Sequence, residues 1–148
     1  MKPFILLLTV YIVSILAFYI ATGDFNTTFS GRLALSVMLI FTAIGHFKFT
    51  AGMVLMVPDF VPQKKLLVLL TGIFEIAFAM LIMIAATRYY AALVLLAFLI
   101  VIFPANINAA FKAVNYEQAN FEGPGPAYLF FRIPLQFVLL FWVYIFCL

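Results

Sequence analysis

Long apolar runs, separated by short polar segments, dominate this sequence. A transmembrane helix needs about 20 predominantly apolar residues. The runs that reach this length cover residues 3–22, 33–57, 66–87, 89–111 and 128–148. We therefore expect an all-α fold, an integral membrane helical bundle that forms a single membrane domain over residues 1–148.

We expect the first run, residues 3–22, to be a retained helix. It could also be a signal peptide, but the apolar region of a signal peptide is usually about 7–15 residues long and ends at a small-residue cleavage site. This run is longer, and Tyr19-Ile20-Ala21-Thr22 fits such a site poorly.

The second run, residues 33–57, is too long for a single spanning helix. Its Thr50-Ala51-Gly52 is followed by Pro58 and Pro62, which interrupt regular helix. We predict that the spanning part ends near residue 50 and that residues 52–62 lie along the membrane interface.

Basic residues in short loops predict the orientation, because cytoplasmic loops carry an excess of Lys and Arg. With five spans, one side holds Lys2, Lys64, Lys65, Lys112 and Arg132, and the other side holds Arg32 and Arg88. The N-terminus is expected in the cytoplasm and the C-terminus outside. The expected location is the bacterial inner (plasma) membrane.

Glu75 lies near the middle of the apolar run 66–87. A charged side chain in hydrocarbon costs several kcal/mol, so it persists only when neutral, paired, or facing protein or water. Counted inward at about 1.5 Å per residue, the depths are roughly 14 Å for Glu75, 12 Å for Gln136, 9 Å for Asn106 and 6 Å for Arg132. His46 enters the same half of the membrane, and Thr71 precedes Glu75 by four residues and shares its helix face.

A shared depth on separate helices predicts either a polar pocket that opens toward the cytoplasm or simple packing. Polar side chains hold membrane helices together with about 0.6 to 2 kcal/mol per interaction, and this alternative stays open, above all for Asn106 and Gln136. An imidazole titrates near neutrality, so His46 beside Glu75 favours a functional site. Arg132 marks the membrane boundary or reaches Glu75 or a ligand carboxylate.

Composition excludes several classes of function. The chain is 68% hydrophobic and 9% charged, and its basic residues form no stripe, so nucleic acid is not an expected partner. Its one cysteine forms no internal disulfide, and its one histidine excludes a bis-histidine haem from this chain alone. His46 and Glu75 fall short of a metal site, so no metal is expected. Catalytic residues stay unknown, and whether the protein is an enzyme stays open.

The chain resembles the DoxX-like family of small membrane proteins over residues 32–148. The motifs that carry this resemblance are Gly45-His46-Phe47, Pro58-Asp59, Val61-Pro62, Thr71-Gly72-x-x-Glu75-Ile76, Phe103-Pro104-Ala105-Asn106-Ile107 and Arg132-Ile133-Pro134-Leu135-Gln136. The resemblance implies a four-helix core, to which residues 3–22 add an N-terminal transmembrane helix. It also implies an association with oxidoreductase systems such as thiosulfate:quinone oxidoreduction.

Two hypotheses follow. In the first, His46, Glu75, Asn106, Gln136, Arg132 and Thr71 line a cytoplasm-side pocket that binds a quinone or another lipophilic molecule, or that serves a membrane redox complex. In the second, the protein is a non-enzymatic assembly or chaperone subunit whose polar cluster only fixes helix packing. Its partners would then be the lipid bilayer, a membrane protein or further copies of itself.

Overall fold

The chain folds into helices joined by short connections. The computed structural model describes residues 2–148, and in that range it contains helices and turns but no strand; the expected all-α class is confirmed for this part. The elements are α1 (Lys2–Thr22), α2 (Thr27–Lys48), α3 (Thr50–Met56), α4 (Lys64–Leu81), α5 (Arg88–Phe111), the short 3-10 turn η1 (Pro126–Tyr128) and α6 (Leu129–Cys147).

Within residues 2–148, four segments are long and apolar enough to cross a membrane: Lys2–Thr22, Thr27–Lys48, Arg88–Phe111 and Pro126–Cys147. They make this a membrane protein of the helical-bundle class. The fifth expected span corresponds to α4, which has 18 residues and includes Lys64, Lys65 and Glu75. These three charges distinguish α4 from the other long helices.

The third predicted run ends earlier in the structure than the sequence suggests. Helix α4 stops at Leu81, whereas the apolar run extends to Thr87. The hydroxyl of Thr87 donates a hydrogen bond to the Leu81 carbonyl at 2.8 Å, and Arg88 Nε donates to the Ile82 carbonyl at 3.3 Å. These side chains bind carbonyls that the end of a helix leaves without helical partners, so residues 82–87 form a compact turn.

The predicted break near residue 50 is confirmed. Helix α2 ends at Lys48 and α3 starts at Thr50. The hydroxyl of Thr50 donates to the His46 carbonyl at 2.7 Å, and Phe49 N donates to the Gly45 carbonyl at 2.8 Å. The chain therefore turns at Phe49, and these two bonds satisfy the carbonyls of His46 and Gly45.

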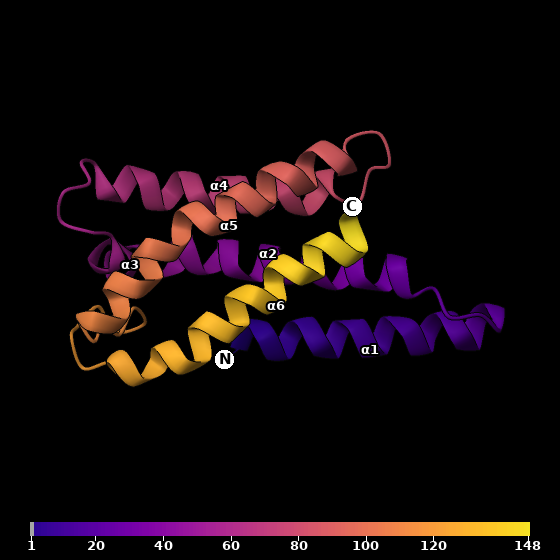
Figure 1. The fold of residues 1–148 in the computed structure, drawn as a ribbon, viewed down its shortest axis with the longest axis horizontal. Coiled ribbons are helices and arrows are strands. Elements are labelled where there is room, and N and C mark those ends of the chain that lie inside the picture. Colours follow the sequence, from indigo (N-terminus) through magenta and orange to yellow (C-terminus); the bar gives the residue numbers. More distant parts are fainter. Residues whose placement is uncertain (1) are drawn as a thin grey trace.

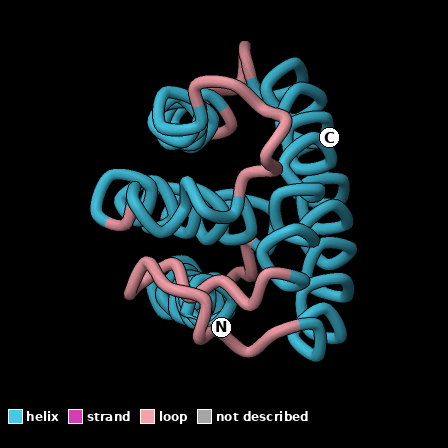
Figure 2. The backbone as a smooth tube through the Cα atoms, turned by 90° about the vertical axis from the view of Figure 1, so that its left-hand side faces the viewer, coloured by secondary structure: helices cyan, strands magenta, loops and turns pink. Residues whose placement is uncertain are grey.

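The helices form two layers. Figure 1 shows α4, α2 and α1 side by side with alternating directions, and α5 and α6 crossing over them. The end-on view of Figure 2 shows the first three stacked in one column and the crossing pair along the other side. The Trp142 indole of α6 donates to the Gly31 carbonyl of α2 at 2.9 Å, and its ring meets Tyr11 of α1 edge-on at 5.0 Å.

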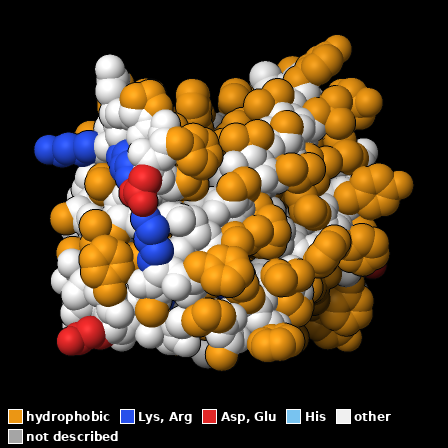
Figure 3. All heavy atoms as spheres, turned by 60° about the vertical axis from the view of Figure 1, so that its left-hand side comes forward, with side chains coloured by type: hydrophobic (Ala, Val, Ile, Leu, Met, Phe, Trp, Pro, Cys, Tyr) orange, Lys and Arg blue, Asp and Glu red, His pale blue; other side chains and the backbone are white. Residues whose placement is uncertain are grey.

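Apolar side chains fill the centre and also cover the outside. Leu35, Ile82, Leu95 and Val143 are fully buried. Exposed apolar side chains nonetheless spread over most of the face in Figure 3, while Lys, Arg, Asp and Glu gather toward one end. Water would not tolerate so much contiguous apolar surface, so lipid is the solvent of this face.

Gly52 in α3 lets the connection after α5 pack closely. A Cβ added at Gly52 would overlap the backbone carbonyl of Tyr116. The Tyr116 ring also meets Phe49 edge-on at 5.9 Å between centroids. The missing side chain of Gly52 therefore fixes how residues 112–125 dock on α3.

We predict that Gly52→Ala lowers the free energy of unfolding by about 1–3 kcal/mol, as expected for overpacking against backbone. Gly45→Ala is the matched control, because its Cβ would meet only Met53 Cε at 3.5 Å. Thermal unfolding in detergent, followed by circular dichroism, measures both. Equal melting temperatures for the two variants would contradict the close approach.

Candidate functional site

His46, Thr71 and Glu75 meet where α2 packs on α4. His46 Nδ1 lies 3.0 Å from the Val68 carbonyl oxygen and 3.0 Å from the Thr71 hydroxyl. On the other side of the ring, His46 Nε2 lies 3.6 Å from Glu75 Oε1. Three of the six predicted residues thus form one contiguous cluster.

The approach of α2 and α4 at this point depends on Gly72. A Cβ added there would lie 2.9 Å from the Cβ of His46, which is closer than two such carbons pack. Gly72 comes between Thr71 and Glu75 on the same helix and is itself buried. In the sequence Thr71-Gly72-x-x-Glu75, Thr71 therefore supplies a hydroxyl and Glu75 a carboxyl. Gly72 leaves room for the part of α2 that carries His46.

Two groups lie at hydrogen-bond distance from Nδ1: the Val68 carbonyl, which can only accept, and the Thr71 hydroxyl, which also donates to that carbonyl at 2.8 Å. A hydrogen on Nδ1 would point to the Val68 carbonyl. In a neutral ring Nε2 is then a lone pair facing Glu75, and a lone pair facing a carboxylate is repulsive. With Nδ1 protonated, a further proton on Nε2 or on Oε1 would remove this repulsion.

The second carboxyl oxygen of Glu75, Oε2, lacks a hydrogen-bond donor within the described residues. Its side chain is 8% exposed, and among residues 2–148 no group forms a hydrogen bond to its buried Oε2. The 3.6 Å gap to His46 also exceeds a good hydrogen bond. A buried polar atom without a partner costs about 1–3 kcal/mol, so this carboxyl lowers the free energy of unfolding.

The other predicted residues are engaged elsewhere. Arg132 Nη1 of α6 donates to Asn106 Oδ1 of α5 at 2.6 Å, and the guanidinium lies over the Tyr128 ring at 4.9 Å. Gln136 Nε2 donates to the Leu99 carbonyl at 2.7 Å. These contacts join α5 to α6, whereas the His46 cluster joins α2 to α4.

The structure therefore groups the six residues into a cluster of three, a pair and a single amide, each with its own contacts. The sequence analysis did not identify Val68 or Tyr128 as contributors. Val68 acts through its backbone carbonyl, which carries no signal in the sequence. Tyr128 had been assigned no role, and only its place one helical turn before Arg132 hints at the stacking.

A separate ionic cluster lies at the end of the bundle where α4 begins. Asp59 accepts from Lys112 at 2.6 Å and from Lys64 at 2.8 Å. These hydrogen bonds, first Lys112 and then Lys64, lower the pKa of Asp59 to about 2. Because the pKa is lowered in the folded state, the bridge persists at neutral pH and is lost only as pH falls toward 2.

No metal site adds to this picture. Within the part of the chain that the structure describes, no group of three His, Cys, Asp or Glu side chains is placed to hold a metal ion.

The fold and the apolar surface define a helical membrane protein with a buried acid–base pair. Residues 35–147 match the family described as a domain of unknown function, DUF8561. The protein belongs to this family, because the match covers most of its 148 residues. No curated protein and no solved structure matches the chain. All six candidate residues lie inside the matched range, and α1 precedes it.

We predict that Glu75→Met leaves the free energy of unfolding unchanged or raises it by up to about 3 kcal/mol, because it removes a buried acceptor that lacks a partner. Ser36→Ala is the contrasting control. Ser36 Oγ donates to the Ala79 carbonyl at 2.7 Å in the same α2–α4 contact, and its loss should cost about 1 kcal/mol.

Chemical unfolding in mixed micelles compares the two variants with the parent protein. Destabilisation by Glu75→Met that equals or exceeds the effect of Ser36→Ala would mean that the carboxyl holds the helices together.

Proposed function

We propose that this protein binds the polar head of a lipophilic molecule at the His46–Glu75 pair, with a quinone as the leading candidate. The observation that carries the proposal is the buried Glu75 Oε2, which has no hydrogen-bond partner among residues 2–148. Its cost to the fold is explained if a ligand supplies the partner.

The shared proton suits this ligand. A quinone offers carbonyl oxygens that accept hydrogen bonds, and a quinol offers hydroxyl groups that donate them. A pair that holds one proton has a donor for the first and an acceptor for the second.

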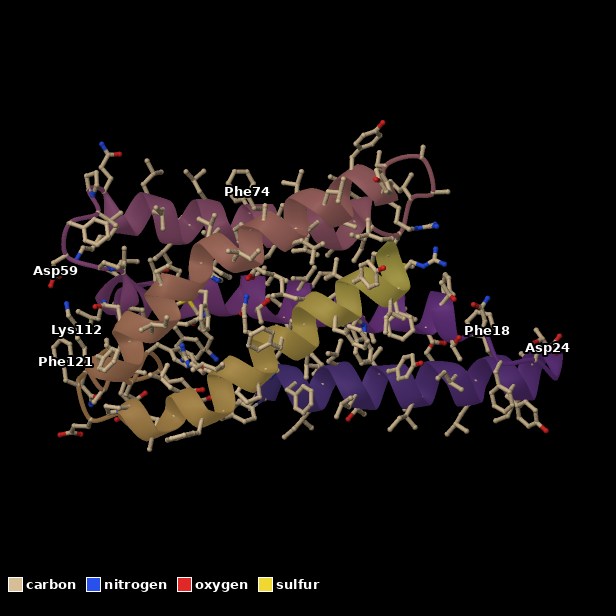
Figure 4. The ribbon with its side chains drawn as sticks, viewed as in Figure 1. Phe18, Asp24, Asp59, Phe74, Lys112 and Phe121 are labelled. Carbon is tan, nitrogen blue, oxygen red and sulfur yellow. The ribbon has the colours of Figure 1, made fainter. Side chains whose placement is uncertain are left out.

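Access from the bilayer supports the proposal. The His46 side chain is 19% exposed, more than that of Glu75, so the imidazole edge reaches the surface. Phe47 beside it is 44% exposed, and Phe74 on α4 is 50% exposed and points outward in Figure 4. Apolar rings next to a polar spot are typical of ligand sites, and they could hold an isoprenoid tail.

The proposal includes α4 as a fifth span. Its 18 residues extend about 27 Å at about 1.5 Å per residue, close to the thickness of a hydrocarbon core of about 30 Å. The chain would then place Lys2, Lys64 and Lys112 on one side, which we infer to be the cytoplasmic side of a bacterial inner membrane. Their contacts with Glu117 and Asp59 support a common side.

We also propose a relation to the DoxX-like bundle, supported by the order of the motifs around His46, Glu75, Asn106 and Arg132. Under this relation α2, α4, α5 and α6 form the core and α1 is the addition. The relation would favour a role beside membrane oxidoreductases.

The second candidate function is a non-enzymatic assembly subunit. The observation in its favour is that Asn106, Arg132 and Gln136 already have partners within the fold. Polar groups that are satisfied internally suit packing rather than ligand binding. This reading does not account for Glu75 Oε2.

Quinone retention tests the proposal. We predict that protein purified in mild detergent carries quinone, and that Glu75→Gln and His46→Ala each weaken binding about 10- to 100-fold. This range corresponds to the loss of one hydrogen bond to a charged group, about 1.5–3 kcal/mol. Solvent extraction followed by mass spectrometry gives the bound amount, and titration with a water-soluble quinone gives the affinity.

Ser36→Ala serves as the control, since it alters the same helix pair without touching the acid–base pair. Unchanged quinone binding in both site variants would refute the proposal. A stoichiometric protein partner, with no quinone or other lipophilic molecule bound, would favour the assembly subunit.

A further inference from the structure

A pocket lies under the connection between α5 and α6. It has a volume of about 230 Å³ and is lined by Ala109, Ala110, Val114, Asn115, Tyr116, Glu117, Glu122, Gly123, Pro124, Gly125, Tyr128 and Arg132. This is smaller than the roughly 300–1,000 Å³ of sites for drug-sized ligands. The pocket is therefore large enough only for a small group, and the charged residues that line it are Glu117, Glu122 and Arg132.

The connection that covers the pocket is ordered by its own hydrogen bonds. Gly123 N donates to the Ala113 carbonyl at 2.7 Å, and Asn115 and Asn120 pair through their backbones. Asn115 Oδ1 also accepts from the backbone N–H groups of Glu117 and Gln118. These contacts hold the pocket wall in place, so the pocket is part of the fold.

Arg132 supplies the positive charge of the pocket. Asn106 Oδ1 accepts from its Nη1 at 2.6 Å, and the Tyr128 ring supports the guanidinium face. A guanidinium carries five N–H donors in a planar fork, so these contacts orient the group without using all of its donors. A phosphate in the pocket would meet a fixed fork of the kind that binds phosphate in a bidentate manner.

The negative charge comes from Glu122. The other carboxylate in the wall, Glu117, is already paired with Lys2 at 2.7 Å, and this hydrogen bond is the main cause of its lowered pKa. Glu122 accepts from the Asn120 amide at 3.4 Å, and within the described residues no cation pairs with it. A purely anionic ligand would meet Glu122, and a purely cationic one would meet Arg132. A ligand that carries both charges satisfies both.

The surroundings indicate a lipid as the source of this ligand. Phe111, Phe121 and Phe130 flank the pocket in sequence and are 67%, 58% and 87% exposed. Phe121 lies at the same end as Lys112 in Figure 4. These exposed phenylalanine rings give acyl chains an apolar surface at the end of the bundle that carries Lys112.

We propose that this pocket binds the headgroup of a phosphatidylethanolamine-type lipid, with its phosphate on Arg132 and its primary ammonium on Glu122. Free phosphoethanolamine shares this chemistry but lacks the acyl chains that the exposed phenylalanines would contact. The site is distinct from the His46–Glu75 pair and does not depend on its function.

Lipid retention in nanodiscs tests the proposal. The protein is placed in discs that contain equal amounts of phosphatidylethanolamine, phosphatidylglycerol and phosphatidylcholine, and native mass spectrometry identifies the lipids that stay bound. The parent protein should retain phosphatidylethanolamine in preference to both others, because phosphatidylglycerol lacks an ammonium and the ammonium of phosphatidylcholine has no N–H to donate.

The variants separate the two charges. Glu122→Gln should abolish the preference over phosphatidylglycerol, and Arg132→Gln should weaken retention of both lipids about 10- to 100-fold. Asp59→Asn is the control, since it removes an exposed carboxylate at the same end outside the pocket. Quinone binding in Glu122→Gln should stay at the parental level. If Arg132→Gln fails to fold, Glu122→Gln decides alone, because its side chain is exposed.

Equal retention of the three lipids by the parent protein would overturn the proposal, as would an unchanged preference in Glu122→Gln. Free phosphoethanolamine, added at millimolar concentration, should not displace the lipid. Displacement would identify the soluble compound as the ligand and overturn the assignment to a lipid.

Discussion

One buried carboxyl group constrains the rest of the structure: Glu75 lies on an apolar helix where α4 packs on α2, its neighbour in the same layer. Glu75 is 6% exposed, and hydrocarbon around it cannot solvate a charge. His46 lies beside one of the two carboxyl oxygens. Its Nε2 faces Glu75 Oε1, while its Nδ1 is within hydrogen-bond distance of the Val68 carbonyl and the Thr71 hydroxyl. The other oxygen, Oε2, has no hydrogen-bond partner among residues 2–148.

The packing of α2 on α4 is arranged around this pair. Gly72 allows the backbones to approach at the site, and the Ser36 hydroxyl binds the Ala79 carbonyl further along the same contact. The turn at Phe49 comes three residues after His46, so the imidazole is held in the last turn of a regular helix. Rigid helices rather than loops therefore carry the acid–base pair, which limits the motion of both groups.

The two polar sites lie on different helices of the bundle. The His46 cluster uses α2 and α4, and the Arg132 pocket uses α5, α6 and the connection between them. The sequence-based depths treated these residues as one set. Each helix has its own tilt, however, and similar depth along separate helices does not bring side chains into contact.

Much of the fold could be predicted from the sequence, because apolar runs of spanning length are a strong signal. The runs that became α1, α5 and α6 match the helices to within one residue at their ends. The break near residue 50 could be predicted from Gly52, Pro58 and Pro62. The end of α4 could not be predicted, because hydrogen bonds from the side chains of Thr87 and Arg88 determine it, and hydropathy does not reveal such bonds.

The candidate site was predictable only in part. Glu75, Thr71 and His46 stood out because polar residues in apolar helices are costly, and the structure places them together. The partners of Arg132 and Gln136 depend on how α6 crosses α5, which periodicity does not specify. The pocket under residues 112–125 depends on a loop in which Ala113 and Ala119 have positive φ. Alanine rarely adopts this conformation, so the sequence does not predict it.

Proton sharing between His46 and Glu75 can be measured directly, because the chain has a single histidine. Nitrogen-15 NMR of histidine-labelled protein in nanodiscs reports which ring nitrogen carries hydrogen. The account predicts a protonated Nδ1, together with an Nε2 resonance that moves both on adding quinone and in Glu75→Gln. A protonated Nε2 beside a bare Nδ1, unaffected by quinone and by Glu75→Gln, would contradict it.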